Sequence, residues 1–408
     1  MGYEQAAVRI IEKLEEHGFE AYFVGGCVRD WLLGRTVHDI DICTNAHPGD
    51  VISLFPDHVP TGLKHGTVSV KMDGYLFEVT TFRTEGKYED YRRPADVQFV
   101  SDLKLDLERR DFTINAMAMD RDRRLYDPFG GQQDAQQQLI RAVGEPGERF
   151  REDALRLLRA ARFAAQLGFS IEEQTLHAMR TTAPLLAHIA VERVREELNK
   201  LLNSPTPERG CQIIQDTSLL LALPGLQQLF AVSCPQAWRL VHVGSVAQKW
   251  ALLLYAAGYT CEQARQVCLY LRMSKRETED MALYVQMLRE IGPQWDRPAP
   301  VAWGTMLLRH GLPVCQQLHE LLRACWWQRR SECPSEELMQ TYEALPVKSG
   351  KELAINGRDL QDEIGKKAGE WVAHVLHYLL EQTALHGLPN TREALIEAAR
   401  KEVIRNEY

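Results

Sequence analysis

The sequence predicts an α+β protein in which a small head, with a mixed sheet and flanking helices, is followed by an all-α remainder. Three observations lead to this prediction. Short segments of alternating apolar residues, typical of strands, occur only within about the first 140 of the 408 residues. From about residue 150 onward, apolar residues recur every three or four positions, as they do on helices. Proline-containing breaks at 204–207, 297–300 and 345–346 divide this second part into helical blocks.

The elements of the head can be read off in order. Apolar spacing and glycine stops predict helices over 6–17 and 28–33, while alternation predicts strands over 21–24, 39–42, 67–72 and 75–81. Between the last two strands, Asp73-Gly74 is a strong signal for a tight hairpin turn. After the first strand, Gly25-Gly26 predicts an abrupt turn into the next helix.

Charge and composition limit the function classes. The chain has 48 basic and 56 acidic residues, which gives a net charge of −8. Proteins that coat nucleic acid without selectivity usually carry net positive charge, so the sum argues against that class. The net charge does not exclude a local basic site, because it does not say where in the protein the charges lie.

No segment approaches the roughly 18 apolar residues of a membrane span, and no signal peptide is visible. We therefore expect no membrane partner and a cytoplasmic location. The cysteines number nine, an odd count, and none forms a Cys-x-x-Cys pair. This pattern predicts free thiols in a reducing compartment rather than disulfides or a zinc site.

Asp39 and Asp41 form the first candidate for chemistry. Residues two apart on a strand face the same side, roughly 6.6 Å apart along the chain. An isolated pair of this kind is usually a pair of surface acids, but here it follows the Gly25-Gly26 turn. Two carboxylates facing one side can hold Mg²⁺, which prefers oxygen ligands, and a two-metal site can drive nucleotidyl transfer. Glu78, on a neighbouring strand, is the candidate third carboxylate, with a salt-bridged strand residue as the alternative interpretation.

The glycine turn is the candidate phosphate site. Exposed backbone N–H groups of Gly25 and Gly26 at a helix start bind phosphates well. Arg29, in the following helix, would add a side-chain clamp on a triphosphate.

Gly25–Arg35 followed by Asp39–Thr44 resembles the first signature of class II tRNA nucleotidyltransferases. This family of CCA-adding enzymes and bacterial poly(A) polymerases belongs to the polymerase-β-like superfamily. Further segments resemble its later signatures in the same order: Arg109–Ala116, Asp127–Gly131 with Asp134, Arg151–Arg156, His188–Arg193 continuing to Glu197 and Lys200, and Glu352–Leu360 in the C-terminal half. Cys27 and Cys43 stand where the family pattern has alanine.

The resemblance implies a division of the chain into four parts: a polymerase-β-like nucleotidyltransferase head over 1–140, a base-recognising neck over 141–204, a helical body over 205–340 and a tRNA-binding tail over 341–408. It implies that Arg110, Arg159 and Arg162 support the triphosphate and that Asp111 accepts from the ribose hydroxyls. The implied substrates are tRNA, CTP and ATP.

The segment after Phe150 predicts how a base is selected. On a helix over 151–166, Glu152, Asp153, Arg156 and Arg159 fall on one face. Such a charged face is often only solvated, but Asp153 can accept from the exocyclic amine of cytosine or adenine. Arg156 can donate to the adjacent ring nitrogen. Uracil and guanine present the opposite polarity, so one Asp/Arg pair can accept C and A while it rejects U and G. The resemblance assigns the same role to these two positions.

The charged segment 82–94 has weak periodicity and predicts a mobile loop. In the resembled family this loop is needed for the switch from adding C to adding A, and here it has full length. The leading prediction is template-independent addition of CCA to tRNA, and A-only addition remains open. Three further functions stay open with less support: poly(A) polymerase, an inactive RNA-binding protein and a small-molecule nucleotidyltransferase. The oligomeric state is open, with a homodimer as one option.

Overall fold

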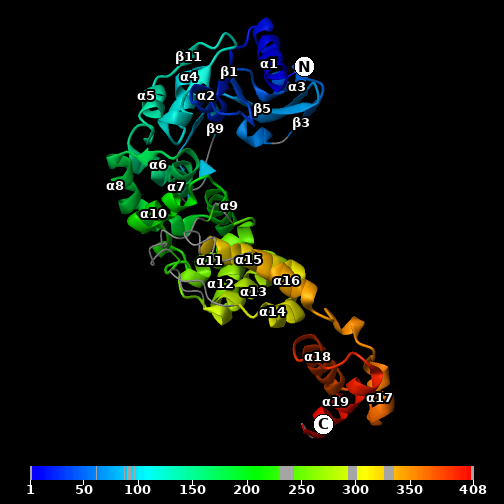
Figure 1. Cartoon of the computed structure of the whole chain (residues 1–408). Coiled ribbons are helices and arrows are strands. Elements are labelled where there is room, and N and C mark those ends of the chain that lie inside the picture. The colour runs from blue at the N-terminus through cyan, green and yellow to red at the C-terminus, as the bar shows by residue number, and fades with distance from the viewer. Residues whose placement is uncertain are drawn as a thin grey trace. The chain divides into compact units, whose positions relative to one another are not determined.

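The computed structural model describes residues 2–60, 62–86, 88–89, 93–94, 97–229, 240, 243–292, 301–325 and 335–405. These residues divide into two compact units (Figure 1). The first comprises Met1–Ser233 with Gln266–Lys275, and the second comprises Cys234–Arg265 with Arg276–Tyr408. All the described strands but one, Ser170–Ile171, lie within residues 1–140, so the predicted α+β head followed by a mainly helical remainder is confirmed. The predicted break at 297–300 falls outside the described residues.

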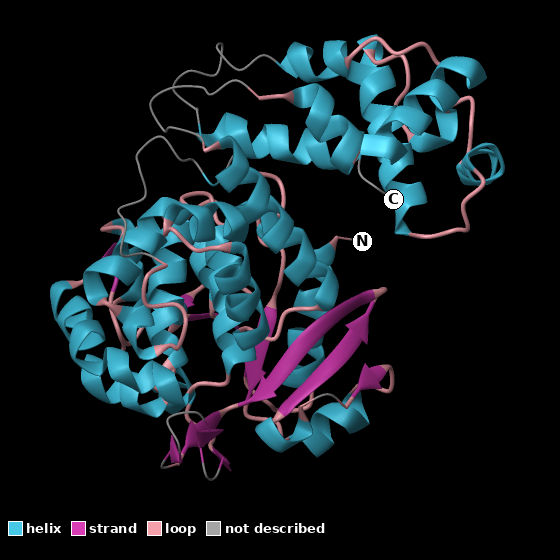
Figure 2. Ribbon diagram, turned by 90° about the horizontal axis from the view of Figure 1, so that it is seen from below, coloured by secondary structure: helices cyan, strands magenta, loops and turns pink. Residues whose placement is uncertain are grey.

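The described residues of the head form a seven-stranded mixed sheet, drawn as magenta arrows in Figure 2. Its order is β11 (Leu125–Tyr126), β10 (Ala118–Met119), β1 (Ala21–Val24), β2 (Asp41–Thr44), β5 (Tyr75–Thr81), β4 (Thr67–Met72) and β3 (His58–Val59). Only the central β2–β5 pair is parallel. Asp73 and Gly74 both have positive φ, +53° and +84°, as the predicted hairpin turn requires.

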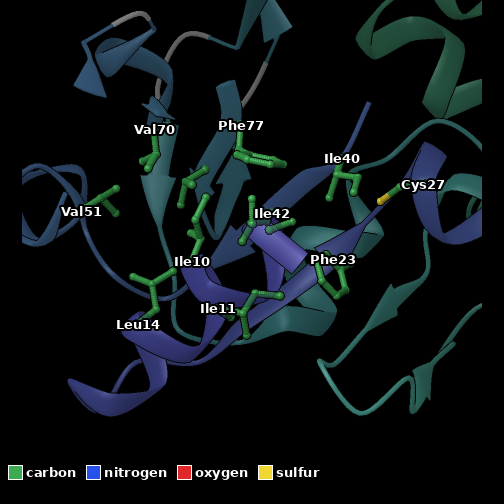
Figure 3. Close-up of a cluster of buried hydrophobic side chains, with 14 of the residues drawn as sticks. Ile10, Ile11, Leu14, Phe23, Cys27, Ile40, Ile42, Val51, Val70 and Phe77 are labelled. Carbon is green, nitrogen blue, oxygen red and sulfur yellow. The ribbon is translucent and has the colours of Figure 1, made fainter. Parts of the chain in front are cut away.

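One face of the sheet is covered by helices and contains the main core of the head (Figure 3). The helices on this face are α1 (Tyr3–Glu16), α2 (Gly26–Leu32) and α3 (Pro48–Leu54). The 3₁₀ turn Leu63–His65 precedes β4. Ile10, Ile11 and Leu14 of α1 pack against Phe23, Ile42 and Phe77 of the sheet. Because these α1 positions recur at three and four residues, the apolar stripe alone predicted this helix.

The opposite face of the sheet is partly polar and carries a smaller core. Val24, Cys43 and Phe82 pack there against α4 (Leu103–Glu108). The row formed by Val24, Asp41, Glu78 and Ser69 crosses four adjacent strands in register. The predicted carboxylates therefore lie at the boundary between this small core and the polar part of the face.

The segment predicted as a loop over 82–94 contains short strands. The described residues pair β6 (Arg83–Glu85) with β9 (Val97–Phe99) and β7 (Tyr88–Glu89) with β8 (Arg93–Pro94). The prediction of a segment without secondary structure is thus wrong for these residues. The pairing could not be predicted from the segment alone, because it is charged and its partner strand, which places Val97 opposite Glu85 and Phe99 opposite Arg83, lies beyond residue 94.

The rest of the first unit is mainly helical. Its remaining elements are the 3₁₀ turn Thr113–Asn115, α5 (Gly131–Gln136), β12 (Leu139–Ile140), α6 (Pro146–Glu152), α7 (Leu155–Leu167), β13 (Ser170–Ile171), α8 (Glu173–Thr182), the 3₁₀ helix Ala183–His188, α9 (Val191–Leu202), α10 (Pro207–Thr217) and the 3₁₀ turn Leu219–Ala222. Helix α10 lies close against α7, since a Cβ on Gly210 would be 2.9 Å from the carbonyl oxygen of Ala161.

The predicted continuous helix over 151–166 is wrong. Helix α6 ends at Glu152, Asp153 has extended backbone angles of φ −137° and ψ 102°, and α7 begins at Leu155. The break is held by the Asp153 side chain, whose Oδ1 accepts from the Leu155 N–H at 3.0 Å. The arrangement of Asp153 and Arg156 therefore depends on this turn and not on a shared helix face.

Among its described residues, the second unit contains helices and their connections but no strand. Helices in and around it are α11 (Val246–Ala256), α12 (Cys261–Tyr270), α13 (Lys275–Ile291), α14 (Trp303–His310), α15 (Leu312–Cys325), α16 (Ser335–Ala344), α17 (Gly357–Ile364), α18 (Glu370–Leu385) and α19 (Arg392–Arg405), with a 3₁₀ turn at Gly350–Glu352. In the part of the chain that the structure describes, no helix combines the length and apolarity that a membrane span requires. Among the residues described in the two units, six cysteines take no part in a disulfide: Cys27, Cys43, Cys211, Cys261, Cys268 and Cys315. Cys234 and Cys333, and the side chain of Cys325, fall outside the described residues.

Candidate functional site

A cavity of about 490 Å³ lies in the first unit, between the start of α2, residues 109–115 and helix α7. Its lining consists of Gly25, Gly26, Arg29, Asp41, Arg109, Arg110, Asp111, Asn115, Asp153, Leu155, Arg156, Arg159, Arg162, Phe163, Gln166 and Arg193. The structure thus brings together all nine residues predicted to bind the nucleotide, with one of the three predicted catalytic carboxylates. Asp39 and Glu78 do not line this cavity.

The predicted carboxylates are neighbours at the cavity edge. Asp41 begins β2 and lies directly across from Glu78 of β5, while Asp39 precedes the strand. Burial, Asp39 and Glu78 raise the pKa of Asp41 to about 6, and Arg110 opposes them. No group of three or more His, Cys, Asp or Glu side chains close enough to hold a metal occurs among the described residues. Nevertheless, the mutual repulsion of these acids is what a bound divalent cation would relieve, so the donor set fits such an ion.

The Arg110 guanidinium packs close against the glycine turn and leaves little room for a side chain at Gly25. Gly25 has φ +76°, and a Cβ at this position would lie 3.0 Å from Nη1 of Arg110. A side chain would therefore be strained and would also displace a cavity-lining guanidinium. Arg29 follows in α2, where its Nη1 donates to Oδ1 of Asn115 at 2.6 Å and its Nε donates to Asp30 at 2.9 Å. Asn115 and Asp30 thus hold the Arg29 guanidinium, the predicted clamp, close to the start of α2.

Asp106 anchors the two arginines that follow it. Its fully buried carboxylate accepts from Arg109 at 2.7 Å and from Arg110 at 3.2 Å. Burial favours the neutral acid, but Arg110 and Arg109 outweigh burial and lower the pKa of Asp106 below its ordinary value. Sequence analysis missed Asp106, although its spacing of three and four residues from these arginines on α4 was a usable signal.

Asp111 is tied to both sides of the cavity. Its carboxylate accepts from Arg159 at 2.6 Å and from Nδ2 of Asn115 at 3.1 Å. Burial alone would raise the pKa of Asp111, but Arg159 and the Asn115 hydrogen bond lower it to about 2. The residue predicted to meet the ribose therefore also positions Arg159. Asn115 then links Asp111 to Arg29, a role that sequence analysis did not assign.

The predicted base-reading pair is held from two directions. Oδ2 of Asp153 accepts from Arg193 of α9 at 2.8 Å. Arg156 donates through Nη1 to Glu152 at 2.6 Å and through Nη2 to the carbonyl oxygen of Arg109 at 2.7 Å. Sequence analysis quoted Arg193 within a motif but gave it no role, because 40 residues separate it from Asp153.

Arg162 lines the cavity and contacts an acid from α9, Glu197. Its Nε donates to Glu197 at 2.5 Å and its Nη1 donates to Gln166 at 2.9 Å. Burial and the neighbouring Arg159 lower the pKa of Arg162, while Glu197 acts in the opposite direction. In the lining as a whole, seven arginines face three aspartates. This excess suits a ligand with several negative charges, such as a triphosphate.

Comparisons with known proteins give the family. Family models match in three stretches: the poly A polymerase head domain over residues 21–141, the "Probable RNA and SrmB- binding site of polymerase A" over 168–230 and the tRNA nucleotidyltransferase domain 2 over 241–399. The chain is 42% identical to the CCA-adding enzyme of Geobacillus thermodenitrificans over 393 residues, which cover 96% of this chain and 95% of that one. The chain belongs to the CCA-adding enzyme family.

Other members of the CCA-adding enzyme family agree with this. The Geobacillus stearothermophilus enzyme is 40% identical over 96% of this chain and 95% of its own length. The crystal structure of the Bacillus stearothermophilus CCA-adding enzyme in complex with CTP superimposes with a TM-score of 0.85 at 36% identity and covers 100% of both chains. The Thermotoga maritima enzyme complexed with tRNA has the same fold, with a TM-score of 0.65 at 22% identity over 98% of this chain and 96% of that one.

Family membership confirms the resemblance inferred from the sequence motifs, and it confirms that the chain is a nucleotidyltransferase. The hypothesis of an RNA-binding protein without activity is thereby set aside. Nucleotidyltransferases of this superfamily normally use a divalent metal ion, which agrees with the chemistry of the carboxylates at the cavity edge.

Proposed function

We propose that this chain adds the 3′-terminal CCA to tRNA, without a nucleic-acid template, from CTP and ATP. The 3′-hydroxyl of tRNA attacks the α-phosphorus, an O–P bond forms, and the bond to the β-phosphate breaks to release pyrophosphate. The observation that carries the proposal is the cavity of the first unit, in which the base-reading pair Asp153 and Arg156 faces the same space as the glycine turn and the arginines. The CCA-adding relatives support it.

In this proposal the amino acids themselves act as the template. Asp153 accepts from the exocyclic amine of the base, and Arg156 donates to the ring nitrogen next to it. The Asp153 ion pair with Arg193 keeps the carboxylate in place, while Glu152 and the Arg109 carbonyl do the same for Arg156. Uridine and guanosine triphosphates would leave these groups mismatched, and unpaired polar groups in a closed site give strong discrimination.

The triphosphate is assigned to the other side of the cavity. Gly25 and Gly26 present the start of α2, and their neighbours Arg29, Arg110, Arg159 and Arg162 supply positive charge. Asp111 accepts from the ribose hydroxyls, which would favour ribonucleotides over deoxyribonucleotides. Because Asp111 also holds Arg159, the sugar and the phosphates are read by one connected set of side chains.

The metal is proposed to be Mg²⁺, held by Asp39 and Asp41 with Glu78 as the third carboxylate. When bound, it would neutralise charge on the reacting phosphate and on the leaving pyrophosphate. Asp41 of β2 lies across from Glu78 of β5, and Asp39 lies two residues before Asp41. Repulsion from Asp39 and Glu78 contributes to the raised pKa of Asp41. We expect Asp39→Ala or Asp41→Ala to abolish addition and leave tRNA binding nearly intact.

The proposed partners are tRNA, CTP and ATP, and tRNA maturation would place the reaction in the cytoplasm. We retain the four-part division at residues 140, 204 and 340 as a proposal, with tRNA held by the part beyond 340. The homodimer remains one option for the oligomeric state.

The experiment offers purified protein three tRNAs that end before CCA, after C and after CC, each with CTP, ATP or both. The proposed function predicts that each tRNA is completed to CCA when both nucleotides are present. Addition only to the tRNA that ends in CC would assign the chain to A-only addition. A long poly(A) product would assign it to poly(A) polymerases. Asp57→Ala is the matched control for the aspartate variants, because Asp57 is exposed and pairs with Lys71 on the surface.

A further inference from the structure

The ring of Phe163 is surrounded by three guanidinium groups. The Cζ atoms of Arg162, Arg159 and Arg29 lie 4.0 Å, 5.3 Å and 5.4 Å from its centroid. Arg159 and Arg162 precede Phe163 on α7, whereas Arg29 comes from α2, more than a hundred residues earlier in the chain. Phe112 packs edge-on against the same ring, with centroids 5.8 Å apart and planes at 83°.

These three arginines are three of the four that are assigned to the phosphate side of the cavity; the fourth is Arg110. Arg29 and Arg162 are buried, and Phe163 is itself only 5% exposed although it lines the cavity. Positive groups so close together in a poorly hydrated place repel one another. Burial is the main cause of the lowered pKa of Arg162; Glu197 opposes it, and the repulsion from Arg159 adds to it.

Each guanidinium has a carboxylate partner of its own. Asp30 pairs with Arg29 at 2.9 Å, Asp111 pairs with Arg159 at 2.6 Å and Glu197 pairs with Arg162 at 2.5 Å. What the three guanidinium groups share is the aromatic ring. The face of an aromatic ring is electron-rich and attracts cations within about 6 Å, yet it carries no net charge. A carboxylate in the same place would gather the arginines equally well but would repel a triphosphate.

A plain packing role is the simpler interpretation, since a phenylalanine on a buried helix is usually core. Here, however, the neighbours of Phe163 on α7 are small residues, Ala160, Ala161 and Ala164, which fill the buried side of the helix. The ring itself contacts the guanidinium groups at the cavity.

We propose that Phe163 is a positioning residue that holds Arg29, Arg159 and Arg162 in the arrangement that binds the triphosphate of the incoming nucleotide. The inference rests on the proposed function and deepens it. Phe163 does not touch the reacting atoms; it fixes the positions of the guanidinium groups that bind the phosphates. It should therefore control affinity for the triphosphate and leave the choice of base unchanged.

The test replaces Phe163 by phenylalanine with one, two and three ring fluorines, which withdraw electrons from the ring face at nearly constant volume. Binding of CTP and of cytidine to the full chain is measured by calorimetry in the presence of Mg²⁺. We expect CTP affinity to fall stepwise with each fluorine and to be about ten-fold lower in Phe163→Leu. Cytidine affinity and the CTP-to-UTP selectivity of addition should stay unchanged.

Phe150 is the matched control, because it is a fully buried phenylalanine of the adjacent helix α6. The same fluorinated residues there should leave CTP affinity unchanged. An equal CTP affinity for all the fluorinated Phe163 proteins would overturn the inference, even if Phe163→Leu unfolds. The variants Arg29→Gln, Arg159→Gln and Arg162→Gln separate the two proposals. If they weaken CTP binding while fluorination does not, only the role of Phe163 is wrong; if they leave CTP binding unchanged, the proposed triphosphate site is wrong, and the role of Phe163 with it.

Discussion

At the scale of single residues, each side chain predicted to bind the nucleotide is paired with a side chain that holds it. Asp153 is held by Arg193, Arg110 by Asp106 and Arg29 by Asn115. A side chain held in this way loses little further freedom when substrate binds, which is what precise discrimination between bases requires.

Arg193 provides the first test of this arrangement. Arg193→Gln removes the ion pair that orients Asp153, so we expect kcat/KM for CTP to fall roughly 10- to 100-fold. Because uracil gains nothing from a well-placed carboxylate, UTP use should change less and the CTP-to-UTP ratio should fall. Single-nucleotide addition to tRNA measures both. Arg195→Gln is the control, since Arg195 lies on the same helix and contacts the backbone carbonyls of Leu271 and Arg272. An unchanged ratio in Arg193→Gln would show that the ion pair does not orient Asp153, the proposed base-reading acid.

Asp111 makes stability depend on pH. Its pKa in the folded protein is about 2, below the ordinary value of 3.8, so folding favours the ionised form. The stabilisation is complete above about pH 4 and is lost as the pH falls toward 2; its size is about 2 kcal/mol. Asp111→Asn should therefore lower the free energy of unfolding by about this amount at pH 6, measured by urea denaturation, and by less as the pH falls toward 3. Asp57→Asn, which alters an exposed surface pair, should have little effect at any pH. A deficit of Asp111→Asn that is equal at pH 6 and pH 3 would contradict the assignment.

At the scale of elements, the turn between β1 and α2 determines where Arg110 can lie. Gly25 and Gly34 flank α2, and both have positive φ, +76° and +64°. A substitution at Gly34 costs about 1 kcal/mol of backbone strain, and one at Gly25 costs more, because its ψ of −127° lies outside the left-handed helical region. Only at Gly25 does the new Cβ also meet a side chain, Nη1 of Arg110 at 3.0 Å, whereas nothing lies within 4 Å at Gly34.

Alanine at these two positions therefore separates strain from function. Gly34→Ala should lower stability slightly and leave nucleotide addition unchanged. Gly25→Ala should lose more stability than Gly34→Ala and, in addition, weaken CTP binding by roughly ten-fold, because Arg110 is displaced. Thermal unfolding and CTP titration of the two variants give the comparison. Equal CTP affinity in both would show that the position of Arg110 is not set by the glycine turn.

Some elements of the fold are specified by residues close together in the sequence, and these could be predicted; others depend on distant residues. Helix α1 and the β4–β5 hairpin were predictable, because the apolar stripe and the Asp73-Gly74 turn specify them within a few residues. The break at Asp153 was not, since neither glycine nor proline stands there. It is held in part by Arg193, 40 residues further along the chain. The same limit applies to the site: sequence motifs brought out the residues that face the cavity, while the pairing of Asn115 with Arg29 and of Arg193 with Asp153 becomes visible only in three dimensions.

At the scale of the whole molecule, an acidic chain is assigned a polyanionic partner. The net charge is −8, yet the lining of the cavity contains four more arginines than aspartates. Positive charge is thus concentrated where the triphosphate is proposed to lie, and the rest of the chain is more acidic than the sum suggests. With positive charge concentrated in one place, we expect tRNA to be bound over a limited surface and with modest affinity. Modest affinity suits an enzyme that must release its product.

This distribution predicts a shallow dependence of tRNA binding on salt. Each phosphate neutralised by the protein releases counterions, so the slope of log K against log salt counts the contacts. With few basic groups engaged, we expect a slope of about −3 for tRNA lacking CCA, measured by filter binding between about 50 and 300 mM salt. Replacing Lys366 and Lys367 together by Gln tests the tail: a slope shallower by one or two would assign them to the RNA contact. Lys71→Gln is the control, because Lys71 faces Asp57 on the surface of the head. A slope steeper than about −6 for the unaltered protein would show that tRNA is instead held along an extended basic surface.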